Sequence, residues 1–176
     1  INRPILYKPY YRFIRSRVSI GIRGGLELVK RFETIFINYE EDVDAGTQKK
    51  YEISISPKEL NLKSFKVLGW NVQRAEYADE TTAGTAVAWH FVKNRSSDEA
   101  LAVAATTWQS GKGYLGGGAL VNTGGRAVLY NPNYNFPEAV PFDRDDVLYC
   151  SIRFINKGGA AKRFEILLTL YLEVED

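Results

Sequence analysis

The sequence predicts an all-β protein, built as an antiparallel β-sandwich or barrel. Apolar residues alternate with polar ones along several segments, and Tyr, Phe and Trp make up 13% of the chain. No alternation of strands with helices is visible, which disfavours a parallel sheet. The connections between the predicted strands differ widely in length, and this favours the jelly-roll type over a barrel of even hairpins.

The first two thirds of the chain contain short predicted strands separated by polar turns. These strands cover residues 18–22, 32–39, 51–55, 65–73, 87–91 and 126–130. The strands at 65–73 and 87–91 flank a polar turn, so the pattern predicts a β-hairpin there. The sequence thus supplies most of the strands that a sandwich of 176 residues needs.

The last third carries the clearest alternation. Residues 148–154 and 164–174 each place apolar side chains at every second position, and Lys157-Gly158-Gly159 separates the two segments. This pattern predicts a long, half-buried antiparallel hairpin at the end of the chain.

Three segments are harder to assign. Residues 95–109 fit a helix capped by Ser97 and a further strand equally well. The glycine-rich residues 111–118 lack the spacing of a phosphate-binding loop, so we interpret them as a flexible surface loop. Residues 131–141, rich in Pro, Asn and Tyr, are predicted to form an irregular loop.

Charge is distributed unevenly along the chain. Residues 1–31 contain eight Lys or Arg and one acid, a net +7, whereas the remaining residues carry a net −5. Pro4 and Pro9 disfavour a long helix at the start. We therefore expect residues 1–23 to form an extended basic and aromatic arm, and residues 24–176 to form one jelly-roll domain.

Such an arm can neutralise phosphates and offer rings for stacking, or it can contact neighbouring subunits. An edge-packed strand whose arginines face water is an equally good interpretation. The candidate contact residues are Arg3, Lys8, Arg12, Arg15, Arg17 and Arg23.

The composition argues against catalysis. One His and one Cys cannot form a disulfide framework or a Cys/His zinc site within one chain. His90 would have to serve any Ser–His–Asp triad alone, and Cys150 is predicted to be a buried small hydrophobic residue. We expect no enzymatic activity, no small-molecule substrate and no transmembrane segment, since no apolar run approaches roughly 18 residues.

Two further groups of residues are candidate sites. Clustered carboxylates at two turns could bind Ca²⁺ at subunit interfaces, although carboxylates at turns are usually only solvated; no other cofactor is expected. A loop with exposed rings and amides could contact a ligand. The carboxylates are Asp42, Asp44, Asp143, Asp145 and Asp146, and the loop residues are Tyr130, Asn133, Tyr134 and Phe136.

Taken together, these segments resemble the single jelly-roll capsid proteins of small icosahedral viruses. The resemblance rests on the arm at 3–23, the strands at 65–73 and 87–91, and the closing strands at 146–156 and 163–175. It implies a coat protein of the virion that self-assembles into an icosahedral shell. It also implies an arm that faces genomic nucleic acid or an internal membrane, or that ties subunits together.

Two other functions compete with this one. A trimeric receptor- or carbohydrate-binding sandwich, like a virus spike or a tumour-necrosis-factor-like module, would suit the aromatic loops. An enzyme of the cupin type would need several histidines for its metal, and the chain has one.

Overall fold

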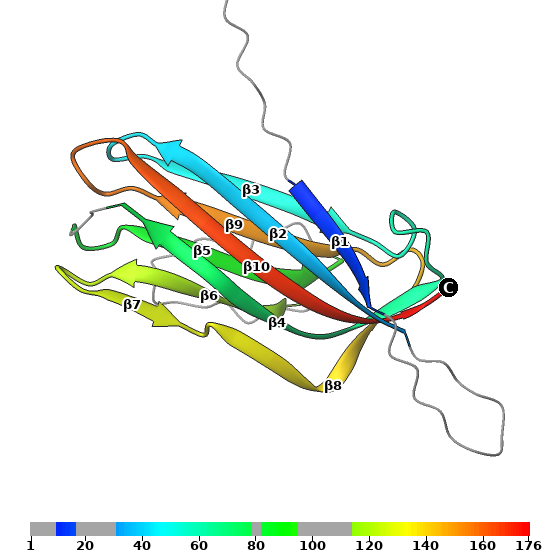
Figure 1. Ribbon diagram of the computed structural model, residues 1–176. Coiled ribbons are helices and arrows are strands. Elements are labelled where there is room, and N and C mark those ends of the chain that lie inside the picture. The colour runs from blue at the N-terminus through cyan, green and yellow to red at the C-terminus, as the bar shows by residue number, and fades with distance from the viewer. Residues whose placement is uncertain (1–9, 17–30, 79–81, 95–113) are drawn as a thin grey trace, which may run out of the picture.

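The computed structural model describes residues 10–16, 31–78, 82–94 and 114–176, and these form an antiparallel β-sandwich without a helix (Figure 1). This confirms the predicted fold class. The strands are β1 (Tyr10–Ser16), β2 (Arg31–Val43), β3 (Gln48–Ile55), β4 (Ser64–Tyr77), β5 (Ala86–Lys93), β6 (Tyr114–Asn122), β7 (Ala127–Tyr130), β8 (Asn133–Phe142), β9 (Leu148–Ile155) and β10 (Lys162–Glu175).

The strand order is that of a jelly roll. One five-stranded sheet has the order β1-β2-β10-β4-β8, and the other has the order β3-β9-β5-β6-β7. The antiparallel pairs are nested along the chain: β5 with β6 innermost, then β4 with β8, β3 with β9, and β2 with β10 outermost. Successive pairs alternate between the sheets, as in a hairpin of strands that has been rolled up.

This order corrects both predicted hairpins. The strands themselves are present, but β9 pairs with β3 and β5 whereas β10 pairs with β2 and β4. Likewise β4 and β5 belong to opposite sheets. Alternation shows which face of a strand is buried and not which strand lies beside it, and two facing sheets satisfy the same pattern as a hairpin does.

The two sheets bury their inner faces against each other. The apolar face of β10 lies at the centre, and each of its residues is at most 7% exposed. Aromatic rings make contacts across the core between strands that follow one another in the chain. The ring pairs are Tyr39 with Tyr51 at 4.6 Å, Phe154 with Phe164 at 5.5 Å and Trp70 with Trp89 at 6.3 Å between centroids.

Asn156 fixes the connection through which the chain crosses from one sheet to the other. This residue follows β9 and is fully buried. Its side-chain amide donates to the carbonyl oxygens of Val43 and Ala160, both at 2.8 Å, and its side-chain oxygen accepts from the Gly158 amide at 2.9 Å. Because the buried side chain satisfies three backbone groups, it holds the β9–β10 connection against the end of β2.

The glycine-rich segment is a strand in its described part, which corrects the prediction of a flexible loop from residue 114 onward. Gly116, Gly117 and Gly118 lie in β6 and pair with β5. A side chain at Gly118 would overlap the Trp89 ring, and at Gly117 it would overlap the backbone of the same residue. Glycine inside a strand can mark such a close approach.

The predicted loop at 131–141 is also largely a strand. Residues Asn133–Phe142 form β8, which pairs with β4 at the edge of its sheet. The register shifts between Val67 and Gly69, and Pro137 lies in the stretch of β8 opposite that shift. Prolines are tolerated at sheet edges and irregularities because no ladder hydrogen bond is lost there. The proline-rich composition of this segment therefore wrongly predicted a loop.

Several predictions concern residues outside the described part of the chain. The strand at 18–22 and the helix or strand at 95–109 both lie there. Within the predicted arm, residues 10–16 form β1 at the edge beside β2, and the division of the chain at residue 23 stays a prediction. Among the described residues, none belongs to a helix with the length and apolar character that a bilayer-spanning segment needs.

The close packing of β6 gives a first prediction. Replacing Gly118 with Ala would place a Cβ against the Trp89 ring and only 2.5 Å and 2.6 Å from the carbonyl oxygens of Asn131 and Tyr130. We expect Gly118→Ala to lower the free energy of unfolding by about 1–3 kcal/mol, measured by urea denaturation. Gly159→Ala is the control, because a Cβ there meets no atom within 4 Å. Equal stabilities of the two variants would contradict the packing of β6.

Candidate interaction surfaces

A pocket opens where the two sheets meet at the edge formed by β8. Trp70 of β4 and Tyr134 of β8 are directly opposed cross-strand partners, so their side chains lie on the same face of the sheet. Their rings stack with centroids 6.5 Å apart and planes 25° apart, and Phe136 meets Tyr134 edge-on at 5.0 Å. The pocket has a volume of about 480 Å³ and is lined by Trp70, Tyr114, Leu115, Gly116, Gly117, Asn131, Tyr134 and Phe136.

The floor of this pocket contains a buried donor. Trp70 is 1% exposed, and its indole Nε1 has no hydrogen-bond acceptor among the described residues. Gly116 adopts φ +119°, and a Cβ at this glycine would lie 3.5 Å from the same nitrogen. Although Nε1 has almost no accessible surface, the missing side chain at Gly116 leaves a space of about one methyl group beside this nitrogen on the pocket side.

The strands beside the pocket carry exposed apolar side chains. Leu129 and Tyr130 of β7 and Tyr134 of β8 are 44–47% exposed. β7 and β8 are the edge strands of their two sheets and lie along the same side of the sandwich (Figure 1). Asn131, which joins them, adopts a positive φ of 47°. This side thus combines rings, amides and an open pocket.

The structure brings together part of the predicted ligand loop. Tyr134 and Phe136 line the pocket, whereas Tyr130 and Asn133 lie next to it and are absent from its lining. Sequence reasoning did not single out Trp70, which lies in the predicted strand at 65–73, or Gly116, which lies in the predicted loop at 111–118. A glycine next to strand-forming residues is the signal that could have found this site.

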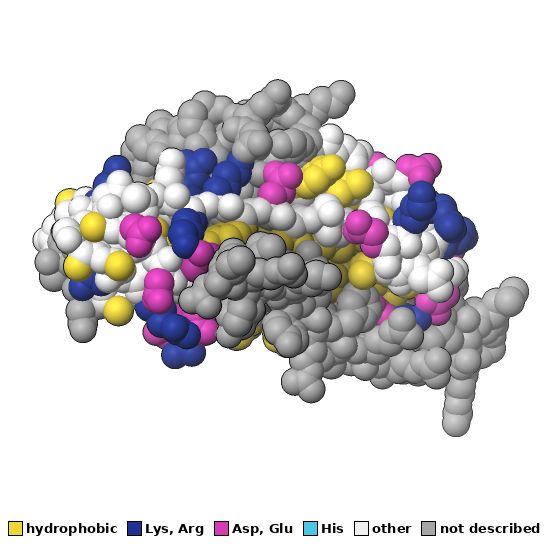
Figure 2. Space-filling model, turned by 90° about the horizontal axis from the view of Figure 1, so that it is seen from above, with side chains coloured by type: hydrophobic (Ala, Val, Ile, Leu, Met, Phe, Trp, Pro, Cys, Tyr) yellow, Lys and Arg dark blue, Asp and Glu magenta, His cyan; other side chains and the backbone are white. Residues whose placement is uncertain are grey.

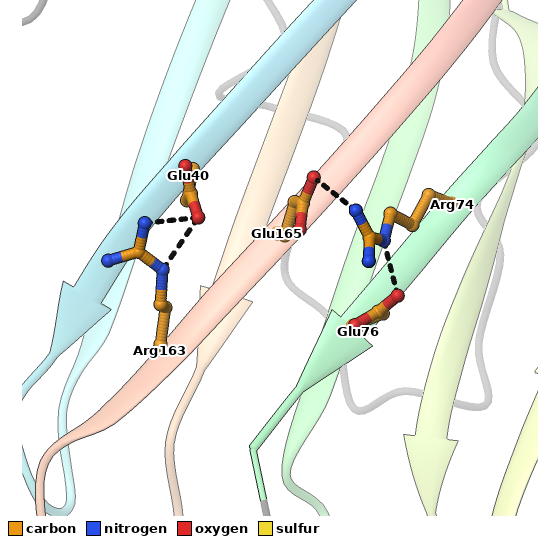
Figure 3. Close-up of polar contacts among 5 residues, drawn as sticks. All are labelled: Glu40, Arg74, Glu76, Arg163 and Glu165. Carbon is orange, nitrogen blue, oxygen red and sulfur yellow. Dashed lines mark hydrogen bonds and ion pairs between the residues drawn. The ribbon is translucent and has the colours of Figure 1, made fainter.

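The outer face of the first sheet carries a row of charges across three strands. Glu165 of β10 lies directly opposite Glu40 of β2 and Glu76 of β4, an arrangement that by itself is repulsive. Two arginines from diagonal positions compensate, as Figure 3 shows: Arg163 binds Glu40 at 2.6 Å, and Arg74 bridges Glu76 and Glu165. The row is exposed to solvent, so these ion pairs contribute little to the stability of the fold.

Charges of both signs therefore lie close together. In the space-filling view, basic and acidic side chains of the described residues are interspersed around patches of apolar surface (Figure 2). A mixed surface of this kind favours solubility and does not by itself attract a polyanion.

The structure places the predicted arm residues only in part. Arg12 and Arg15 lie in β1, where their Cα atoms pair with Phe36 and Glu33 of β2. Arg3, Lys8, Arg17 and Arg23 lie outside the described residues, so their role stays a prediction.

The two acidic clusters lie at opposite ends of the sandwich. Asp42 and Asp44 are at the β2–β3 turn, beside the end of β9, whereas Asp143, Asp145 and Asp146 precede the start of β9. They therefore cannot share one ion within a subunit. Among the described residues, no three His, Cys, Asp or Glu side chains are grouped closely enough to hold a metal. Calcium at subunit interfaces stays a prediction.

The carboxylate of Asp146 is bound by neighbouring groups of the protein itself. Lys93 approaches one of its oxygens at 2.8 Å, the Asn94 amide donates to the other at 2.5 Å, and the Asp143 backbone amide donates at 2.9 Å. Burial alone would raise the pKa of Asp146, but these hydrogen bonds outweigh it and lower the pKa to about 2. The carboxylate thus stabilises the β8–β9 turn at neutral pH.

His90 and Cys150, whose side-chain types often serve in catalysis, are both buried. Cys150 is fully buried in the core, as predicted, and burial raises the pKa of its thiol strongly. His90 is 1% exposed, and neither ring nitrogen has a hydrogen-bond partner among the described residues. Burial, reinforced by the positive charges of Lys50 and Arg153, lowers the pKa of His90 to about 4. At neutral pH this imidazole is uncharged.

Comparisons with known proteins were made for sequence and structure. No protein-family model and no curated protein sequence matches the chain. Among solved structures, the decameric BFDV capsid protein matches with 11% identity and a TM-score of 0.35, covering 83% of this chain and 100% of that protein. The infectious bursal disease virus VP2 subviral particle matches with 10% identity and a TM-score of 0.29, covering 88% of this chain and 42% of that one.

The buried imidazole gives a second prediction. The pKa of His90 is lower in the folded state, about 4, than its ordinary value of 6.5, so the unfolded chain binds this proton first as the pH falls. Its contribution to stability is complete above pH 6.5 and is lost between pH 6.5 and 4, a loss of about 3 kcal/mol.

The measurement is the free energy of unfolding against pH for the wild type and His90→Gln. Titrating carboxylates such as Asp146 affect both proteins alike, so the difference between the curves isolates the histidine. We expect the wild type to lose more stability than the variant over this pH range. Parallel curves would show that the imidazole is not buried in its neutral form.

Proposed function

We propose that this chain is a structural capsid subunit of a virion, which self-assembles into a closed shell through its jelly-roll domain and its basic N-terminal segment. The observation that carries the proposal is the nested jelly-roll pairing of β2–β10, with the basic segment entering the same sheet as edge strand β1. Jelly rolls serve mainly in viral capsids, lectins and cupins.

The composition helps to choose among these three uses. Cupin metal sites need several histidines, and this sequence has one, which the fold buries. A lectin needs a sugar site but has no need for a strongly basic N-terminal segment. A net charge of +7 over residues 1–31, against −5 elsewhere, suits a subunit whose first segment contacts an anionic partner. Genomic nucleic acid and an internal membrane are both such partners.

The position of β1 supports a role in subunit contacts. β1 occupies one edge of its sheet, so its outer side presents a row of backbone groups without a strand partner in the described structure. A strand of a neighbouring subunit could continue the sheet there, since edge addition is a common mode of association. The arm would then tie subunits together while its basic residues remain available for an anionic partner.

A trimeric receptor-binding module is the second candidate. The exposed side chains Leu129, Tyr130 and Tyr134 favour it, because rings at an open edge suit contacts with a receptor or a glycan. The assembly state separates the two functions directly, since a module of this kind stops at a trimer.

The capsid role predicts large closed assemblies of the purified chain. We expect particles of uniform diameter in negative-stain microscopy, and light scattering of a mass many times the 19.9 kDa of one chain. Varying the salt concentration controls for charge repulsion between basic segments. A strict monomer at micromolar concentration under all salt conditions would refute the proposal, and a trimer that does not grow would favour the binding module.

The basic segment predicts a separation between folding and assembly. Deleting residues 1–23 removes β1 and leaves the other four strands of its sheet in place, so the sandwich should stay folded by circular dichroism while particles are lost. A second variant changes the six bases of this segment to Gln and keeps its length. The ratio of absorbance at 260 and 280 nm measures the nucleic acid in the particles. If the Gln variant forms particles that contain none, the basic side chains bind the packaged nucleic acid. Normal particles from the deletion variant would refute a role of the arm in assembly.

A further inference from the structure

We propose that the pocket between β4, β6 and β8 binds an uncharged sugar ring, stacked on Tyr134 and hydrogen-bonded by the indole N–H of Trp70. The site is separate from the proposed assembly surfaces of the N-terminal segment, because β1 and β8 are opposite edges of the same sheet. The proposal therefore does not depend on whether the chain forms shells. It assigns a ligand class to a pocket whose size, about 480 Å³, falls within the range of small-molecule sites.

The first argument is the aromatic platform. The Tyr134 side chain is 47% exposed at the open edge, yet its ring is held from two sides: it stacks on Trp70, and Phe136 meets it edge-on. A ring fixed in this way loses little conformational freedom when a ligand stacks on it. The C–H face of a sugar ring is a flat apolar surface that suits such a ring.

The second argument is the buried donor. The Trp70 Nε1 has no acceptor among the described residues, and indole nitrogens normally find one when they are buried. Gly116 leaves a space beside this nitrogen on the pocket side, and a ligand oxygen must enter that space to reach the buried donor. A hydroxyl group of a ligand would accept this hydrogen bond, whereas an apolar side chain of another protein would leave it unmade. The donor thus favours a ligand that carries oxygen atoms beside an apolar face.

The third argument is the charge of the lining. Aromatic rings, one leucine, two glycines and an asparagine form the pocket, and the lining contains no Asp, Glu, Lys, Arg or His. Sulfated or sialylated sugars are normally bound through Arg or Lys, which the lining lacks. The Asn131 side chain can both donate and accept hydrogen bonds, which matches the hydroxyl groups of a neutral sugar.

The test is a titration of the full chain with neutral methyl hexopyranosides. Saturation-transfer NMR shows which sugar protons touch the protein and remains applicable to large assemblies. We expect saturable binding of at least one hexopyranoside, with the strongest transfer to protons on one face of the ring. Tyr134→Ala should weaken the affinity at least about tenfold, because the platform is lost, and Tyr134→Phe should keep it.

The matched control is Tyr130→Ala. Tyr130 is 44% exposed and lies on the neighbouring strand, but it does not line the pocket, so its removal should leave sugar binding unchanged. Because both tyrosines are nearly half exposed, we expect both variants to stay folded, and urea denaturation verifies this. The comparison of the two variants distinguishes binding in the pocket from nonspecific binding at the β7–β8 edge.

Three outcomes would overturn the proposal. Absence of saturable binding for the whole neutral panel would do so, as would equal weakening by Tyr130→Ala and Tyr134→Ala. Tighter binding of sialyllactose or a heparin disaccharide than of any neutral sugar would contradict the uncharged lining. If Tyr134→Ala changes the assembly state and the wild type binds no sugar, the pocket holds a neighbouring subunit instead. Failure to form shells, by contrast, affects only the proposed capsid role.

Discussion

The fold depends on the burial of one face of β10. Its apolar residues, from Phe164 to Val174, are almost completely removed from water, and the strand is paired on both sides by β2 and β4. A strand with such a face needs a second apolar layer above it, because a single sheet would leave that face in water. β9, β5 and β3 supply the layer, and the chain reaches it by crossing between the sheets in six of the nine steps from β1 to β10.

The crossing determines where the free surfaces of the molecule are. The strand order places β1 and β8 at the edges of one sheet, and β3 and β7 at the edges of the other. β1 belongs to the basic N-terminal segment, whereas β7 and β8 carry exposed rings. The two edges of the first sheet therefore differ in chemistry, and the proposed assembly contact and the proposed sugar site lie on opposite sides of the domain.

The buried interior constrains the molecule's response to pH. Cys150 and His90 are both buried, and each is held in its uncharged form at neutral pH by the cost of desolvation. On the outer face of the first sheet, Arg74 and Arg163 bind a row of three glutamates and reduce their mutual repulsion across the strands. Mild acid therefore affects the core through His90 before it affects Asp146.

The sequence by itself determined the all-β class and the buried face of each regular strand, because side chains alternate strictly between the two faces of a strand. It could not determine strand pairing, since β9 and β10 would show the same alternation in a hairpin as in facing sheets. It also could not identify β6 and β8 as strands. The glycines of β6 are explained only by the close approach of Trp89, and the prolines of β8 only by its position at the edge of the sheet. The pocket is likewise a product of tertiary structure: Trp70, Gly116 and Tyr134 lie far apart in the chain and meet only because β4, β6 and β8 converge at one edge of the sandwich.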